Sequence, residues 1–236
     1  MIYKTTWEEK EALEKYLREN LPTRKIQRSR SQASSPILFI RKANGSLCLC
    51  VDYRGLNNLT IPNKYPLLRI DELLEKTHGS KFFTKLDLKN GSYLIRIAQE
   101  EEWKTAFRTE NGLFEYTVMP FRLTNAPASF QEMMDEIFDG LDGVIWYLDD
   151  ILIYRGSTEE EHQKIVEQVL KRCLDHSLAV NLEKSEFHKP KVDFRGHVVN
   201  GSEISMQAQK IDAILEWQTP TKKKEVQAFL GFANYY

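Results

Sequence analysis

Asp149 and Asp150 form a pair of adjacent carboxylates between two apolar segments, residues 144–146 (VIW) and 151–154 (ILIY). β-Branched and aromatic runs of this kind predict the two buried strands of a hairpin, with the acidic pair at its turn. Ionised aspartates beside buried strands need a cation or strong hydrogen-bond donors as compensation. The pattern therefore indicates a divalent metal site, and the competing interpretation is a turn that carries two solvated aspartates.

A third carboxylate, Asp87, follows residues 81–86 (KFFTKL), which also predict a strand. If this strand lies beside the hairpin, the three carboxylates meet. Three oxygen donors, together with the phosphates of a substrate, suit two Mg²⁺ ions about 3.5 to 4 Å apart. We expect residues 94–97 (LIRI) to be the returning partner of this strand.

The composition is that of a globular protein of one or two domains, with 236 residues, 42% hydrophobic and 28% charged. No apolar run approaches the roughly 18 residues of a membrane span, and the first residues lack the apolar stretch of a signal peptide. We therefore expect a protein that works inside the cell without contacting a membrane. The three cysteines, Cys48, Cys50 and Cys173, form no CxxC pair, and their odd number argues against a disulfide framework.

Basic side chains are concentrated near the N-terminus. The net charge of −1 makes no argument for nucleic acid, because contact with phosphates depends on local basic surface. Residues 20–51 contain no acidic side chain, while their basic residues are Arg24, Lys25, Arg28, Arg30, Arg41 and Lys42. This segment fits either a surface that contacts a polyanion or a solvated loop.

Apolar periodicity and turn residues predict the other elements. We expect helices over residues 7–20, 71–76, 127–138 and 158–177, with Asn125 near the start of the third. Asn44-Gly45 predicts the turn of a hairpin between residues 37–40 and 47–51, and residues 192–199 predict another strand pair. Irregularly interleaved helices and strands favour an α+β fold with an antiparallel sheet.

Several motifs occur in an order that resembles the reverse transcriptases of gypsy-class LTR retrotransposons (Metaviridae). They are residues 51–57 (VDYRGLN), 85–88 (KLDL), 103–107 (WKTAF), 116–121 (YTVMPF), 123–127 (LTNAP), 147–150 (YLDD) and 225–236 (EVQAFLGFANYY). The resemblance covers nearly the whole chain, and it favours the metal interpretation of Asp149 and Asp150 over the solvated turn.

The resemblance implies a right-hand polymerase fold with an antiparallel palm sheet, fingers of helices and hairpins, and the start of a thumb. Its expected divisions are fingers at 1–61 and 95–125, palm at 62–94 and 126–204, and a truncated thumb or connection at 205–236.

The resemblance also implies the role of individual residues. Asp87, Asp149 and Asp150 would bind two Mg²⁺ ions, with Mn²⁺ as a possible substitute, and Lys184 would protonate the leaving pyrophosphate. The expected nucleotide-binding residues are Lys42, Leu88, Ser92, Phe121 and Arg122. The expected template and primer contacts are Arg54, Asn57, Pro127, Gln131, Tyr147, Gly196 and His197.

Four positions depart from the family pattern. Cys48 replaces an arginine that contacts the triphosphate, Ser92 replaces the aromatic residue that excludes a ribose 2′-hydroxyl, and Arg122 replaces a glycine beside the nucleotide. Tyr93 is not expected to substitute for Ser92, because neighbours on an extended chain point to opposite faces. Arg195 replaces an apolar residue in the primer grip.

The implied function is an RNA-directed DNA polymerase that uses an RNA or DNA template, a DNA or tRNA primer and deoxynucleoside triphosphates. The implied source is a longer Pol polyprotein with RNase H and integrase, located in cytoplasmic particles or in the nucleus. The first alternative is a weakened or dead copy that only binds nucleic acid. A two-metal nuclease is a second alternative, disfavoured because the Lys42 hairpin and residues 121–127 suit an incoming nucleotide.

Overall fold

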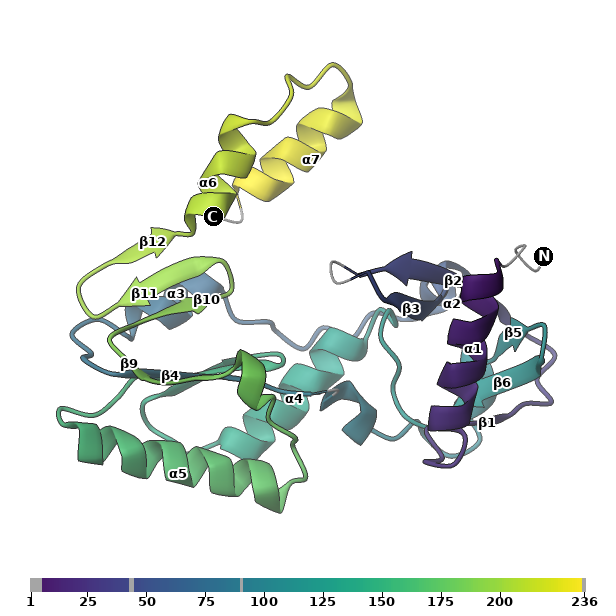
Figure 1. Ribbon diagram of the computed structural model, residues 1–236, viewed down its shortest axis with the longest axis horizontal. Coiled ribbons are helices and arrows are strands. Elements are labelled where there is room, and N and C mark those ends of the chain that lie inside the picture. Colours follow the sequence, from purple (N-terminus) through teal and green to yellow (C-terminus); the bar gives the residue numbers. More distant parts are fainter. Residues whose placement is uncertain (1–5, 43–44, 90, 235–236) are drawn as a thin grey trace. The chain divides into compact units, whose positions relative to one another are not determined.

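The structure, a computed structural model, describes residues 6–42, 45–89 and 91–234 (Figure 1). The chain forms two compact units, the first from residues 1–65 and 90–133 and the second from residues 66–89 and 134–236. Both units combine helices with mainly antiparallel sheets, so the predicted α+β class is confirmed. None of the helices among the described residues combines the length and apolarity that crossing a membrane requires.

The first unit is built on a five-stranded sheet in the order β1-β6-β5-β2-β3. Its strands are β1 (Ile26–Arg28), β2 (Ser35–Arg41), β3 (Leu47–Val51), β5 (Phe107–Thr109) and β6 (Gly112–Tyr116). The unit also contains the helices α1 (Trp7–Asn20) and α2 (Arg54–Leu59) and the 3₁₀ helices η1 (Gly91–Leu94) and η2 (Glu102–Thr105). The predicted helix 7–20 and the predicted hairpin are confirmed, although Asn44 of its turn lies outside the described residues.

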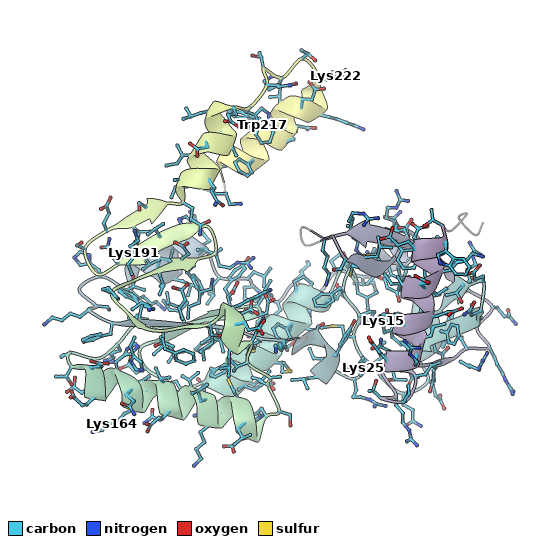
Figure 2. All side chains as sticks on the ribbon, in the orientation of Figure 1. Lys15, Lys25, Lys164, Lys191, Trp217 and Lys222 are labelled. Carbon is cyan, nitrogen blue, oxygen red and sulfur yellow. The ribbon has the colours of Figure 1, made fainter. Side chains whose placement is uncertain are left out.

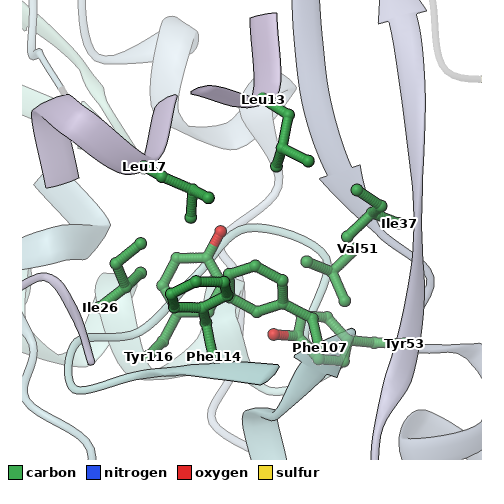
Figure 3. Close-up of a cluster of buried hydrophobic side chains, with 9 residues drawn as sticks. All are labelled: Leu13, Leu17, Ile26, Ile37, Val51, Tyr53, Phe107, Phe114 and Tyr116. Atoms are coloured by element: carbon green, nitrogen blue, oxygen red, sulfur yellow. The ribbon is translucent and has the colours of Figure 1, made fainter. Parts of the chain in front are cut away.

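Helix α1 forms where the sequence supplies both a cap and an apolar face. The Thr6 hydroxyl accepts from the Glu9 backbone N–H, and the Glu9 carboxylate accepts from the Thr6 N–H, a reciprocal capping box. Leu13 and Leu17, one helical turn apart, are buried against the sheet. Figure 3 shows this core, which includes Ile26, Ile37, Val51, Tyr53, Phe107, Phe114 and Tyr116.

The second unit is built on a four-stranded sheet in the order β7-β8-β4-β9. Its strands are β4 (Phe83–Asp87), β7 (Val144–Tyr147), β8 (Asp150–Ile153) and β9 (Glu186–Lys189). A three-stranded sheet follows, of β10 (Lys191–Phe194), β11 (His197–Asn200) and β12 (Ile204–Met206). Figure 1 shows α5 (Glu159–Asp175) on one side of the β4 sheet and the β10–β12 sheet on the other.

The remaining helices are α3 (Ile70–Glu75), α4 (Ala126–Phe138), whose residues are shared between the two units, η3 (Leu182–Lys184), α6 (Ala208–Leu215) and α7 (Lys223–Ala233). Trp217, which follows α6 (Figure 2), packs against α7: its ring centroid lies 5.6 Å from that of Phe229 and 5.4 Å from that of Phe232.

The predicted helices 71–76, 127–138 and 158–177 and the strand pair within 192–199 are confirmed within one or two residues. The predicted strand 94–97 is wrong. Strand β4 pairs with β8 and β9, residues 91–94 form η1, and Arg96 makes an isolated bridge to Val118. Ile97 packs against the core of the first unit, so its apolar pattern reflects burial there.

A buried histidine links β4 to the start of α5. The Nδ1–H of His162 donates to the carbonyl oxygen of Arg155 at 2.8 Å, so in the neutral ring Nε2 accepts from the Thr84 hydroxyl at 2.9 Å. Gly156 is required beside this ring, because its φ is +128° and a Cβ there would lie 2.6 Å from the backbone nitrogen of His162. Burial lowers the pKa of His162, and nearby His188 lowers it further, although the Arg155 carbonyl opposes the shift.

We predict a pH-dependent stability from this histidine. Its folded pKa lies below the unfolded value of 6.5, so the unfolded chain binds the proton first. The free energy of unfolding should therefore be constant above pH 7 and fall as the pH drops below about 6.5. Denaturant titrations between pH 5 and 8 test this. His162→Gln should reduce the dependence of the free energy of unfolding on pH, whereas His176→Gln, at an exposed position, should not. An equal dependence on pH in both variants would contradict the prediction.

Candidate active site

The acidic pair lies at the tip of the β7–β8 hairpin. Tyr147 pairs with Asp150, which leaves Leu148 and Asp149 as a two-residue turn. Leu148 has a φ of +54°, a left-handed conformation that costs a side chain about 1 to 2 kcal/mol. Strain of this kind persists where the surrounding structure holds it, and it is common at functional sites. A bond from the Leu88 N–H to the Asp149 carbonyl, 2.8 Å long, ties the turn to β4.

Strand β4 brings the third carboxylate to the same place. The antiparallel register of β4 and β8 pairs Asp87 directly with Asp150. Directly opposed residues have Cβ atoms about 4.5 to 5.5 Å apart and point to the same face of the sheet. The pairing therefore brings Asp87 and Asp150 together, and Asp149 lies in the adjoining turn.

Asp87 is held by two residues that the sequence did not single out, Asn181 and Ser185. The Asn181 amide nitrogen donates to Asp87 Oδ1 at 3.2 Å, and its backbone N–H donates to the Asp87 carbonyl at 2.8 Å. The Ser185 hydroxyl accepts from the Asp87 N–H at 3.2 Å and donates to the Asn181 carbonyl at 2.7 Å. These residues are distant from Asp87 in the chain, and a single Asn or Ser near a turn carries no sequence signal of its own. Lys184, between them, is exposed.

Arg195 lies against the acidic pair. Its Nη1 is 3.0 Å from Asp150 Oδ2, and its guanidinium lies 5.1 Å from the centre of the Tyr147 ring. It comes from the turn between β10 and β11, where Arg195 and Gly196 have φ values of +49° and +90° and His197 begins β11. Three predicted primer-grip and template residues, Tyr147, Gly196 and His197, thus flank this contact in sequence or space.

The carboxylates influence one another electrostatically. Burial raises the pKa of the Asp149 carboxyl, and the negative charges of Asp150 and Asp87 add to the rise. A backbone N–H and the Arg195 guanidinium oppose it. Because the Asp149 side chain is also exposed at the tip of the hairpin, water screens part of the effect. The site therefore concentrates negative charge at a position that solvent can reach.

The donor set fits a hard divalent cation in its chemistry. Within residues 6–42, 45–89 and 91–234, no three His, Cys, Asp or Glu side chains already surround a common metal position. Carboxylate oxygens are nevertheless the ligands that Mg²⁺ and Mn²⁺ prefer. The buried Oδ1 of Asn181, beside Asp87, has no hydrogen-bond partner among the described residues. This oxygen can therefore accept a hydrogen bond or coordinate a cation.

A second group of predicted residues lines a cavity of about 550 Å³ within the first unit. Lys42, Phe121 and Arg122 line it, together with Lys25, Cys48, Cys50 and Tyr93. Burial raises the pKa of the Cys50 thiol and Cys48 adds to the rise, whereas the positive charges of Arg122 and Lys42 oppose it. Arg122 has a φ of +77°, so an arginine occupies a backbone conformation that favours glycine.

The structure separates Ser92 from this cavity and brings Tyr93 to it. Residues 91–94 form a 3₁₀ helix, so Ser92 and Tyr93 do not point to opposite faces of an extended chain as predicted. The Tyr93 ring centroid lies 5.9 Å from that of Phe121, and the Lys25 ammonium lies over the Tyr93 ring, 5.0 Å from its centroid. Ser92 is 8% exposed, and its buried hydroxyl has no hydrogen-bond partner in the described part of the chain.

The remaining predicted residues differ in exposure and contacts. Arg54 is exposed and forms a two-pronged pair with Asp52, Nε–Oδ1 2.8 Å and Nη2–Oδ2 2.6 Å, and this bonding lowers the pKa of Asp52 to about 2. The Asn57 amide donates to the Arg122 carbonyl at 2.8 Å and so holds the Arg122 loop. Pro127 is exposed, Leu88 is 4% exposed, and Gln131 is fully buried. Their contacts with a nucleotide, template or primer stay predictions.

Comparisons with known proteins identify relatives. Residues 40–199 match the family model described as "Reverse transcriptase (RNA-dependent DNA polymerase)". The chain is 39% identical over 227 residues to the Transposon Tf2-3 and Tf2-7 polyproteins of Schizosaccharomyces pombe, a match that covers 95% of this chain but 17% of each polyprotein.

Solved structures agree with this match. A foamy viral protease-reverse transcriptase in complex with double-stranded DNA aligns with a TM-score of 0.88 and 26% identity, over 100% of this chain and 41% of that one. A foamy viral protease-reverse transcriptase in complex with an RNA/DNA hybrid aligns with a TM-score of 0.85 and 25% identity, over 100% of this chain and 32% of that one. The chain therefore has the α+β polymerase fold of these enzymes.

We predict opposite stability effects for the two neighbouring aspartates. Because the folded pKa of Asp149 is raised, its ionisation opposes folding above pH 4, so Asp149→Asn should unfold at the same temperature as the natural chain or slightly above it at pH 7. Asp150→Asn loses its ion pair with Arg195 and should unfold at a lower temperature. Calorimetry at pH 7 and pH 3.5 tests both. A large loss of stability in Asp149→Asn at pH 7 would contradict the electrostatic assignment.

Proposed function

The chain belongs to the reverse transcriptase family, and on this basis we propose that it is the RNA-directed DNA polymerase core of a gypsy-class LTR retrotransposon Pol polyprotein. It extends a DNA or tRNA primer on an RNA or DNA template with deoxynucleoside triphosphates. The relatives are polyproteins of which the chain spans 17%, which supports a longer product. RNase H and integrase are the further domains proposed for it. The proposed location is intracellular, in cytoplasmic particles or in the nucleus.

The observation that carries the proposal is the pairing of Asp87 with Asp150, with Asp149 in the adjoining turn. Two Mg²⁺ ions bound by these carboxylates, or Mn²⁺ in their place, would activate the primer 3′-hydroxyl for attack on the α-phosphate and stabilise the leaving pyrophosphate. The Asn181 amide donates to the Asp87 carboxylate, and the Ser185 hydroxyl accepts from the Asp87 N–H, which keeps this carboxylate oriented beside the hairpin. Lys184 is proposed to donate a proton to the pyrophosphate.

The cavity of the first unit supports the binding of a triphosphate. Lys25, Lys42 and Arg122 line it, and clustered cations favour a polyphosphate. Cys48 and Arg122 line the same cavity, so the guanidinium absent at position 48 is present at position 122. The two departures from the family pattern therefore compensate each other in charge. The foamy viral relatives solved with double-stranded DNA and with an RNA/DNA hybrid support a nucleic-acid duplex as the second substrate.

Primer extension on an RNA template with Mg²⁺ tests the proposed function. The natural chain should extend the primer, and Asp87→Asn or Asp150→Asn should reduce the rate roughly 100-fold or more, because each removes charge stabilisation at the reacting groups. Asp193→Asn, at an exposed position in the same unit, serves as the matched control and should retain the rate. Extension that survives in both Asp87→Asn and Asp150→Asn would contradict the assignment of the site.

The charge compensation between positions 48 and 122 gives a separate prediction. Arg122→Gly should raise the KM for the triphosphate about tenfold to a hundredfold, because a charge-assisted hydrogen bond contributes about 1.5 to 3 kcal/mol. Adding Cys48→Arg to Arg122→Gly should recover most of the loss. Steady-state kinetics of the two variants and the natural chain provide the measurement. Faster extension by Arg122→Gly alone would show that Arg122 obstructs the nucleotide.

A further inference from the structure

We propose that Arg195 is a built-in counter-ion of the aspartate site and that it sets how tightly this site binds divalent metal. In the absence of metal, the Arg195 guanidinium forms an ion pair with the Asp150 carboxylate. A metal ion that binds this carboxylate must displace the guanidinium. The inference rests on the proposed function, because it takes Asp87, Asp149 and Asp150 to be metal ligands.

The ion pair is close and partly shielded from water. Arg195 Nη1 lies 3.0 Å from Asp150 Oδ2, and the two side chains are 31% and 15% exposed. Coulomb attraction grows as the surrounding dielectric falls, and salt screens a partly buried pair less than an exposed one. Both side chains of this contact are more shielded from water than those of a surface pair such as Arg69 with Asp71, which are 72% and 58% exposed.

The β10–β11 turn and the Tyr147 ring hold the guanidinium in position. Phe194 and His197 pair across the β10–β11 hairpin, which leaves Arg195 and Gly196 as its two-residue turn. Phe194 is fully buried, so the base of this turn is anchored in the core of the unit. The guanidinium also lies 5.1 Å from the centre of the Tyr147 ring, a favourable cation–π contact. Tyr147 is the strand-pairing partner of Asp150, so the ring and the carboxylate that contact the arginine lie side by side on the β7–β8 hairpin.

The arginine occupies a backbone conformation that it does not prefer. Its φ of +49° lies in the left-handed region, where a side chain is strained. The contacts with Asp150 and Tyr147 oppose this strain. An apolar side chain at the same position would carry the strain without the ion pair.

The charge balance explains what the arginine does. Three carboxylates meet at this end of the β4–β8 pair, and like charges at short range destabilise one another unless a cation is present. Arg195 supplies one positive charge to the metal-free protein. The same charge repels an incoming cation and occupies a carboxylate oxygen, so removing it should stabilise the metal-bound state relative to the free one. A positive charge beside a cation site lowers the affinity of this site for a cation. Each tenfold change in affinity corresponds to about 1.4 kcal/mol.

Metal binding by the purified chain, without nucleic acid or nucleotide, tests this inference. Mn²⁺ is the probe, because its free and bound forms are distinguished by electron paramagnetic resonance and it accepts the same oxygen ligands. Arg195→Leu removes this like charge and the competing ion pair, so it should bind Mn²⁺ about tenfold more tightly than the natural chain. It should also show a lower unfolding temperature without metal and a larger rise in that temperature when Mn²⁺ is added.

Two further variants separate the contact from general charge effects. Lys191→Leu removes a cation from an exposed position on β10 (Figure 2) and should leave Mn²⁺ affinity unchanged. Without metal, Arg195→Leu in an Asp150→Asn background should lower the unfolding temperature little further, because the ion pair is already broken. Equal affinities of Arg195→Leu and the natural chain, or an equal gain in Lys191→Leu, would overturn the inference.

The outcome also distinguishes this inference from the proposed function. If Mn²⁺ binds and Asp87→Asn abolishes binding, but Arg195→Leu changes nothing, only the role of Arg195 is refuted. If neither the natural chain nor Arg195→Leu binds Mn²⁺ up to millimolar concentration, both the counter-ion role and the metal site beneath the proposed function fail.

Discussion

The antiparallel pairing of β4 with β8 is the constraint on which the rest of the site depends. It places Asp87 opposite Asp150, and because side chains alternate along a strand, a slip of one residue would turn one carboxylate to the other face. The register is protected by what lies behind it. Phe83, Leu86, Ile151, Leu152 and Ile153 are fully buried along the same two strands, so a slip would also expose the core. Apolar packing thus determines where the charges lie.

Concentrating three carboxylates at one end of a sheet requires compensation, and the structure supplies it from elements that are distant in the chain. Asn181 and Ser185 orient Asp87 through the turn before β9, while Arg195 reaches Asp150 from the β10–β11 turn. Leu148, Arg195 and Arg122 all have positive φ values without being glycine. Strained residues at the hairpin tip, at the counter-ion and in the cavity loop show that local backbone preference yields to the arrangement of charge.

Most elements of the fold follow from local patterns, because caps and apolar periodicity act over a few residues. Thr6 and Glu9 begin α1, Thr158 accepts from the Glu161 N–H to begin α5, and alternating apolar residues form the β2–β3 and β7–β8 hairpins. Two predictions around η1 are wrong: Ser92 and Tyr93 are not extended, and residues 94–97, whose apolar pattern predicts a strand beside β4, do not pair with it. Burial in the first unit produces the same pattern, and only the tertiary structure distinguishes a paired strand from a buried 3₁₀ turn and bridge.

The sequence by itself determined the family, the order of the motifs and the identity of the acidic residues, because these depend on which side chains follow one another. The tertiary structure decided which side chains contact them. It brought Asn181 to Asp87 and Arg195 to Asp150 across long stretches of chain, placed Arg122 beside Cys50, and turned Tyr93 rather than Ser92 into the cavity. The physical reason is that strand pairing and core packing bring together residues that no local pattern connects.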